Sequence, residues 1–162
     1  MKYLIRQKVF SFGDKFTIKD ENDMDCYQVE GKVFSLGAKL SLMDMAGNEQ
    51  YYIEQKLLRL FPEYHLFRQG NQVAVCKKRF SFFGSKFDIQ SPEGIYSLEG
   101  QPMNYTFKLF KDSRLVAIAD KKFFSFTDSY GVEITEDEDH ALILSLIIII
   151  DQVIHNDNNS HN

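Results

Sequence analysis

The stretch Ala141-Leu142-Ile143-Leu144-Ser145-Leu146-Ile147-Ile148-Ile149-Ile150 would be apolar on every face of an α-helix. A helix of that kind must be buried on all sides, either in a protein core or in lipid. A bilayer span needs about 20 apolar residues, and this run is shorter, which favours a buried core helix. Acidic residues flank the run on both sides and basic anchors are missing, which also argues against a transmembrane span.

The residues on either side of this run predict where the helix begins and ends. Thr135-Glu136-Asp137-Glu138 has the pattern of a capping box, in which the Thr135 hydroxyl accepts a backbone N–H and Glu138 reaches back to the cap. We therefore predict a central helix over about 136–155. The polar residues 156–162 are predicted to form a disordered tail.

Upstream of the helix, short apolar-patterned runs alternate with turn residues such as Ala46-Gly47-Asn48 and Ser91-Pro92-Glu93-Gly94. Strands at such even spacing are typical of a sandwich or a barrel. The predicted strands are 3–8, 15–19, 25–31, 39–44, 49–56, 63–68, 72–78, 86–89, 94–99, 105–111, 114–119 and 131–134. Fifteen Phe and eight Tyr residues fit half-buried pleated surfaces and favour a β-rich core.

One module recurs along the chain. Phe10-Ser11-Phe12-Gly13-Asp14-Lys15-Phe16-Thr17-Ile18 matches residues 80–89 with one insertion, 33–42 is a third copy, and Phe124-Ser125-Phe126 begins a weakened fourth. Downstream, Tyr27-Gln28-Val29-Glu30-Gly31 is echoed by 96–100. We predict an internal repeat of about 8–70 and 78–134. Its Phe residues are expected to pack in the core at strand ends, and Gly13, Gly37 and Gly84 to lie in turns or bulges.

A helix that must be surrounded and strands that must hide their edges share one solution, which is a closed barrel with the helix along its axis. The length of 162 residues fits one domain. The fold class predicted is therefore mainly β: a closed antiparallel barrel of about twelve strands around a buried hydrophobic C-terminal α-helix, spanning 1–155.

These features resemble the tubby C-terminal-like superfamily, specifically the bacterial LURP-one-related (LOR) family. The resemblance rests on the Phe-Ser-Phe modules at Phe10 and Phe80, the echo of 27–31 at 96–100, and the apolar terminal helix. It implies a twelve-stranded barrel around a hydrophobic helix. Tubby-like domains bind phosphoinositide headgroups through a basic pocket, and the related scramblases act on phospholipids. By this similarity of fold, the resemblance implies a function that involves phospholipids.

Several function classes are disfavoured by composition and motifs. A formal net charge of −4 argues against a general nucleic-acid binder. The N-terminus lacks the apolar run of a signal peptide, so we expect a cytoplasmic protein. Cys26 and Cys76 are expected to be buried reduced thiols. The four His residues have no ligands at metal spacing and no GxSxG elbow occurs, so we expect no cofactor, no metal and no enzyme activity.

Basic residues precede two of the modules at corresponding positions. Lys77, Lys78 and Arg79 stand before Phe80, as Lys121 and Lys122 stand before Phe124. One interpretation is an anion site for a phospholipid headgroup at a peripheral membrane contact. The other is that these charges are solvated strand ends that prevent edge pairing. The leading hypothesis is thus a non-enzymatic binding module for headgroups or other anions; a protein-interaction scaffold is the alternative, and an unrecognised enzyme the third.

Overall fold

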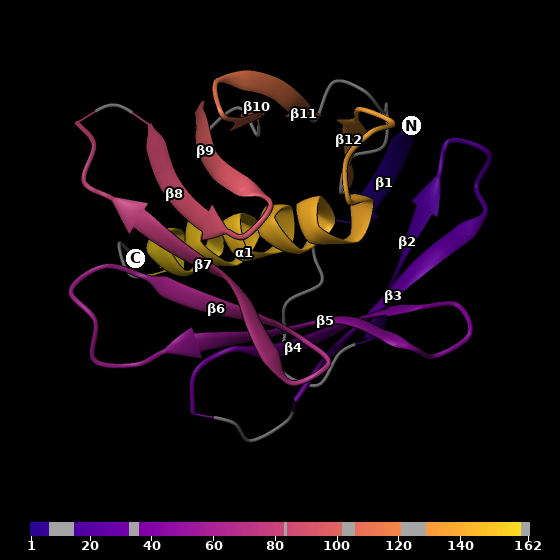
Figure 1. Cartoon of the computed structure of the whole chain (residues 1–162), viewed down its shortest axis with the longest axis horizontal. Coiled ribbons are helices and arrows are strands. Elements are labelled where there is room, and N and C mark those ends of the chain that lie inside the picture. Colours follow the sequence, from indigo (N-terminus) through magenta and orange to yellow (C-terminus); the bar gives the residue numbers. More distant parts are fainter. Residues whose placement is uncertain (7–14, 33–35, 83, 102–105, 121–128, 160–162) are drawn as a thin grey trace.

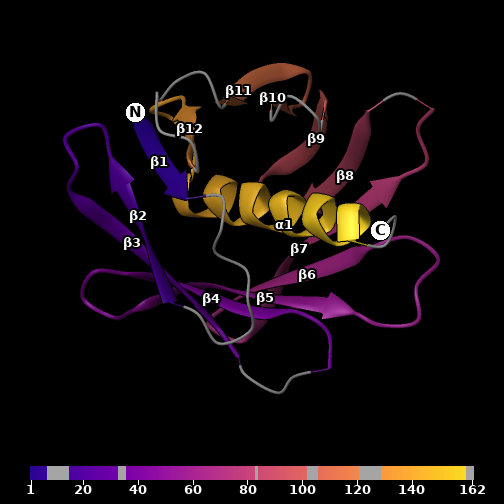
Figure 2. The same cartoon turned by 180° about the vertical axis from the view of Figure 1, so that it is seen from behind.

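The computed structural model describes residues 1–6, 15–32, 36–82, 84–101, 106–120 and 129–159. Over these residues the chain forms a closed antiparallel β-barrel, and one helix, α1 (His140–Asn159), runs along its interior (Figures 1 and 2). The predicted fold class is confirmed. In the described part of the chain, no helix has the length and apolar character needed to cross a membrane.

Twelve strands make up the wall of the barrel within the described residues. They are β1 (Lys2–Arg6), β2 (Lys15–Asp20), β3 (Asp25–Gly31), β4 (Lys39–Asp44), β5 (Glu49–Lys56), β6 (Glu63–Arg68), β7 (Asn71–Arg79), β8 (Ser85–Ser91), β9 (Gly94–Gln101), β10 (Thr106–Lys111), β11 (Arg114–Asp120) and β12 (Ser129–Ile134). Each strand pairs with its neighbours in sequence, and β1 closes the barrel on β12. Because the barrel is closed, each of these strands is paired on both edges, which is how a barrel avoids the exposed edges of an open sheet.

The core lies between the strands and α1. Inward-facing residues alternate along each strand; in β4, for example, Leu40 and Leu42 are buried and their neighbours are more exposed. The helix residues 141–150 are all buried, which confirms the predicted central helix core. Within this apolar run, the Ser145 hydroxyl donates a hydrogen bond to the Ala141 carbonyl at 2.8 Å, so the one polar group is satisfied inside the helix.

The helix begins at His140, which corrects the predicted start at about residue 136 after a Thr135 cap. Residue Asp139 is the N-cap instead, because its Oδ1 accepts the backbone N–H of Leu142 at 2.9 Å. Helix α1 also continues to Asn159, past the predicted boundary at 155 and into the segment expected to be a tail. No Gly or Pro occurs between Asp151 and Asn159 to end it.

The β2–β3 and β8–β9 hairpins have the same register at corresponding positions. Lys15 lies opposite Glu30 in the first hairpin, and Lys86 lies opposite Glu99 in the second. These equal registers support the internal repeat, which remains a prediction. Gly37 and Gly84 have positive φ angles of 78° and 72°, as expected of turn positions, whereas Gly13 lies outside the described residues.

The two ends of the barrel differ in their connections. The turn end carries short turns at 21–24, 45–48, 69–70, 92–93 and 112–113, together with the start of α1. The loop end carries the connections at 32–38, 57–62 and 80–84, together with the C-terminal end of α1. In Figure 1 the connections at 57–62 and 80–84 are on the left, and the turns at 21–24 and 45–48 are on the right.

Candidate functional site

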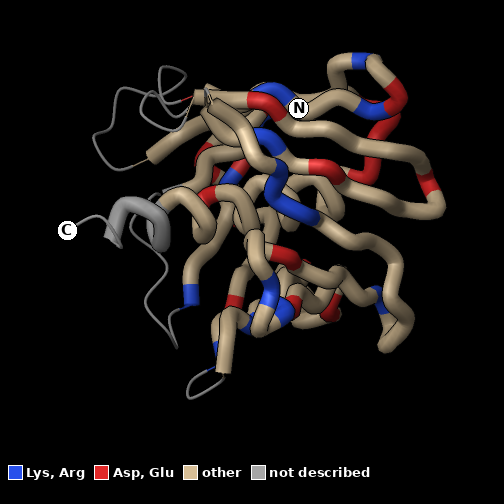
Figure 3. Tube along the Cα trace, turned by 90° about the vertical axis from the view of Figure 1, so that its left-hand side faces the viewer, with Lys and Arg blue, Asp and Glu red and all other residues tan. Residues whose placement is uncertain are grey.

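Charge is distributed unequally between the two ends, although the whole chain is acidic. At the turn end, acidic residues outnumber basic ones: Asp20, Glu21, Asp23, Asp25, Asp44, Glu49, Glu93, Asp112, Glu133, Glu136, Asp137, Glu138 and Asp139 against Lys2, Lys19, Arg68, Lys111 and Arg114. In the described loop half, the order reverses: Lys15, Lys32, Lys39, Lys56, Arg59, Lys77, Lys78, Arg79, Lys86 and Lys108 against Glu30, Glu54, Glu63, Asp88, Glu99, Asp120 and the buried Asp151. Figure 3 shows the left-hand side of Figure 1, with basic positions spread over several strands and acidic positions among them.

Two of the predicted site residues, Lys77 and Arg79, lie on the outer face of β7. Lys77 Nζ is 3.7 Å from Glu63 Oε2, and an Arg79 guanidinium nitrogen is 3.0 Å from Asp88 Oδ2. Both basic side chains remain largely exposed, at 58% and 66%. The Arg79–Asp88 pair is exposed on both partners and contributes little to stability, so Arg79 can exchange its carboxylate for another anion at small cost. The Glu63 carboxylate is only 13% exposed, but the Lys77 ammonium group itself faces solvent.

The other predicted site residues are arranged differently. Lys78 is half-buried and belongs to the inward-facing set of β7 that includes buried Ala74 and Cys76, so it points away from Lys77. Lys121 and Lys122 lie outside the described residues. They follow β11, which β8, β9 and β10 separate from β7. At about 4.8 Å between strands, the ends of β7 and β11 are about 19 Å apart along the wall, too far for one phosphate to bridge.

Sequence reasoning missed two cations near the connection between β5 and β6: Lys56, the last residue of β5, and Arg59 within the connection. Arg59 is 3.7 Å from Glu63 and Lys56 is 3.1 Å from Glu54. Glu63 therefore contacts basic groups from two elements, Arg59 and Lys77, and its own Oε1 lies 2.7 Å from His65 Nε2. The hydrogen bond with His65 lowers the pKa of the Glu63 carboxyl, with smaller effects from Lys77 and Arg59.

The prediction that the repeated Phe residues pack in the core is wrong at Phe80 and Phe82. These two side chains are 66% and 85% exposed, and their rings form an edge-to-face pair with centroids 4.9 Å apart. The strand β8 starts only at Ser85, so this Phe-Ser-Phe segment lies in a connection beyond the barrel wall. The core position in this copy is Phe87, which is 1% exposed.

A surface hollow of about 410 Å³ lies on the outer wall of β8, β9 and β10, at the loop half. It is lined by Ser85, Lys86, Glu99, Gly100, Gln101, Thr106 and Lys108. Lys86 and Lys108 bring two cations to its rim, and Lys86 Nζ is 3.7 Å from Glu99 Oε1. The lining carries two Lys ammonium groups beside the Glu99 carboxylate, so the hollow offers cations to an anionic group of modest size.

The turn end, by contrast, is closed by internal contacts. The Glu138 side chain is 1% exposed and its carboxylate accepts hydrogen bonds from Arg114, from Lys111 at 3.0 Å and from the Tyr96 hydroxyl at 3.3 Å. Burial raises the pKa of Tyr96 to about 12. The hydrogen bond to Glu138 raises the pKa of Lys111. These cations are engaged in holding the helix start and are poorly placed to bind a ligand.

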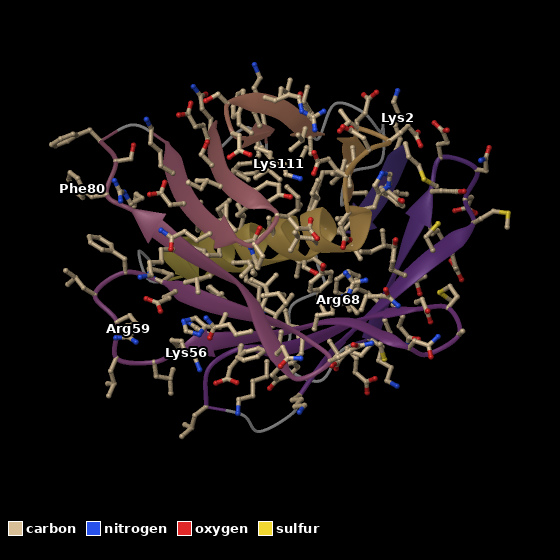
Figure 4. The ribbon with its side chains drawn as sticks, in the orientation of Figure 1. Lys2, Lys56, Arg59, Arg68, Phe80 and Lys111 are labelled. Carbon is tan, nitrogen blue, oxygen red and sulfur yellow. The ribbon has the colours of Figure 1, made fainter. Side chains whose placement is uncertain are left out.

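A second ion pair fixes the helix start on the other side of the barrel. Asp139 Oδ2 accepts hydrogen bonds from the Tyr51 hydroxyl at 2.8 Å and from Arg68 at 3.1 Å. Figure 4 shows Arg68 and Lys111 in the middle of the molecule, away from the edge where Arg59 and Phe80 lie. Carboxylates at a helix N-terminus are also stabilised by the helix dipole. We therefore interpret Arg68, Lys111 and Arg114 at the turn end as residues that hold the start of α1.

The described residues offer neither a reactive buried thiol at Cys76 nor a cluster of metal ligands. Cys76 is buried as expected, and burial raises the pKa of its thiol well above the ordinary range. Cys26 is only partly buried, and both cysteines are free thiols. Among the described side chains, no group of three or more His, Cys, Asp or Glu residues could hold a metal ion.

The closed barrel with an axial helix defines the fold class of this protein. A solved structure of a protein from Arabidopsis thaliana has the same fold, with a TM-score of 0.71 over 94% of this chain and 90% of that chain at 21% identity. The family model for LURP-one-related proteins matches residues 1–151. The chain belongs to the LURP-one-related (LOR) family, as its motifs indicate.

One curated relative is similar over nearly its whole length. It is the uncharacterized protein YxjI of Bacillus subtilis (strain 168), 32% identical over 157 residues that make up 97% of this chain and 96% of the relative. Its description names no ligand or reaction, so the site must be interpreted from this chain's own residues.

Proposed function

We propose that this protein is a non-enzymatic binding module that associates peripherally with anionic phospholipid membranes through its loop end. The observation that carries the proposal is the opposite charge bias of the two barrel ends. An anionic surface attracts the loop half, where Lys and Arg are in excess, and repels the turn end. The same field that draws the protein in therefore also orients it.

A surface with many headgroups suits this site better than a single soluble anion. Lys77 and Arg79 on β7 are separated by three strands from β11, after which Lys121 and Lys122 follow. One phosphate cannot bridge the ends of β7 and β11, but neighbouring headgroups in a membrane can lie over both strand ends. We propose that all five predicted site residues contribute to this contact, with Lys78 serving from the inner rim of the barrel. The hollow with Lys86 and Lys108 offers a recess at the same end.

The test is flotation with vesicles of phosphatidylcholine alone and of phosphatidylcholine with phosphatidylglycerol. We expect co-flotation with the anionic vesicles only, weakening as salt rises. Each basic residue near such a surface contributes about 1 kcal/mol, so Lys77→Gln with Arg79→Gln should weaken partition roughly 30-fold. The matched control is Lys2→Gln with Lys19→Gln at the turn end, which should leave partition within about twofold of wild type.

A third variant tests the same idea in the opposite direction. Glu63 contacts both Arg59 and Lys77, so Glu63→Gln removes the acidic competitor of a bound headgroup. We expect this variant to partition more tightly onto anionic vesicles than wild type. Failure of wild type to float with anionic vesicles at any salt concentration would overturn the proposed function and favour the protein-interaction scaffold.

A further inference from the structure

The loop end carries large apolar side chains that the barrel does not cover. Leu58 is 102% exposed and Leu60 is 91% exposed, in a segment that is fully described. We call the exposed set the apolar rim; it consists of Leu36, Leu57, Leu58, Leu60, Phe61, Phe80 and Phe82. Soluble proteins rarely expose so many large apolar side chains in one patch unless the surface is used in binding.

The three connections that carry the rim adjoin one another. Lys78 of β7 donates its backbone N–H to the Pro62 carbonyl at 3.0 Å, which places the 57–62 connection beside the end of β7. From there the chain continues into Phe80. On the other side, Gln55 donates its backbone N–H to the Ala38 carbonyl at 2.8 Å, and the Leu57 side chain packs over Gly37. The rim is therefore one surface.

The backbone at Leu58 shows that this exposure is imposed by the structure. Its φ is 58°, in the left-handed region that Leu adopts rarely and Gly readily. Such a conformation costs free energy and persists only where the surrounding structure holds it in place. In this case it holds a fully exposed Leu at the tip of the connection, where folding gains nothing from the side chain.

Cations stand next to the apolar side chains in two segments, which run from the ends of β5 and β7 into the connections that follow them. The sequence reads Lys56-Leu57-Leu58-Arg59-Leu60-Phe61 in one and Lys77-Lys78-Arg79-Phe80-Ser81-Phe82 in the other. Figure 4 shows Lys56, Arg59 and Phe80 on the same side of the molecule. A bilayer offers phosphates directly above hydrocarbon, so Lys and Arg can stay at the phosphates while Leu and Phe pass deeper. The charge bias of this end favours an anionic bilayer over an apolar protein surface.

We propose that the apolar rim inserts into the boundary between headgroups and acyl chains of an anionic bilayer, with Leu58, Leu60 and Phe82 penetrating deepest. This inference rests on the proposed function, because the cations bring the rim to the surface. It adds a part of the binding energy that salt does not screen. It also fixes the orientation, with α1 ending toward the membrane and the acidic turn end facing away.

The chain contains no Trp, so a single introduced Trp reports its own surroundings. Leu58→Trp is the probe and Met24→Trp, at a 65% exposed position of the turn end, is the matched control. The vesicles are phosphatidylcholine with phosphatidylglycerol, with and without bromine on the acyl chains. We expect the Leu58→Trp emission to shift to the blue and to be quenched by the brominated lipid. The Met24→Trp emission should change in neither way.

Binding and insertion fail differently in this experiment. If both Trp variants float with the vesicles but the Leu58→Trp emission neither shifts nor is quenched, insertion is overturned and the proposed function stands. If neither variant floats, both proposals are overturned.

As a second readout, Leu58→Ser with Leu60→Ser should weaken partition at least 10-fold at salt concentrations that screen charge. The control pair Met24→Ser with Ile95→Ser should stay within about twofold of wild type.

Discussion

The central helix should make the barrel sensitive to the loss of a few buried carbon atoms. Ile148 is fully buried in the middle of α1. Truncating a buried Ile to Ala costs about 2 to 5 kcal/mol, and the larger values apply where the surroundings cannot collapse into the cavity. The wall around Ile148 is a closed ring of hydrogen-bonded strands and cannot easily move inward. We therefore expect Ile148→Ala to lower the free energy of unfolding by about 4 kcal/mol.

Urea unfolding followed by circular dichroism measures this loss. We expect a lower midpoint with an unchanged m-value, and a melting temperature lower by roughly 8 to 16 °C for a chain of this size. Leu58→Ala is the control, because Leu58 is fully exposed and Ala keeps the same backbone strain; its effect should stay within about 0.5 kcal/mol. A loss under about 1 kcal/mol for Ile148→Ala would refute the reasoning that the helix is the packed centre of the fold.

Two further predictions concern the buried carboxyl group of Asp151 and the close packing of Gly84 against the backbone of Gly100. Burial raises the pKa of Asp151 to about 8, against about 3.9 in an unfolded chain, so the folded state binds more protons between these values. Stability should therefore fall as pH rises from about 5 to 8, and Asp151→Asn should remove that fall; equal pH slopes in urea unfolding would contradict this. At Gly84 an added Cβ would clash with the Gly100 carbonyl oxygen, whereas at Gly47, also at positive φ, it would meet nothing within 4 Å. Thermal melts should thus show Gly84→Ala to be clearly more destabilising than Gly47→Ala, and equal losses would exclude the clash.

Local pattern was enough to predict most of the fold. The strand ranges 25–31, 39–44, 49–56 and 63–68 agree with β3 to β6 at both ends, because turn residues bound each apolar alternation. The helix start was the weak point, since both Thr135 and Asp139 are residues suited to an N-cap. Asp139 is the cap in the structure because Tyr51 and Arg68 hold its other carboxylate oxygen, and those contacts depend on tertiary structure.

The candidate site could be predicted only in part. The basic run 77–79 is visible in the sequence, but strand alternation, which separates Lys78 from Lys77 and Arg79, matters only once β7 is known to extend to Arg79. Phe80 looks like a core residue because apolar side chains are usually buried. The run Leu57 to Phe61 gave a usable signal that was missed: four apolar residues and one Arg in a connection between two strands. A run of that kind is costly to expose and indicates a contact surface.

Hydrogen exchange on the wild-type chain, with and without vesicles of phosphatidylcholine and phosphatidylglycerol, tests the proposed membrane contact most directly. It needs no substitution and reports on both ends of the barrel at once. The account predicts that amides in 57–61 and 79–82 exchange more slowly when vesicles are present, while those in the turns at 21–24 and 45–48 are unchanged. Slower exchange confined to the turn end, or no change at either end in a sample shown to be vesicle-bound, would contradict the loop end as the membrane contact.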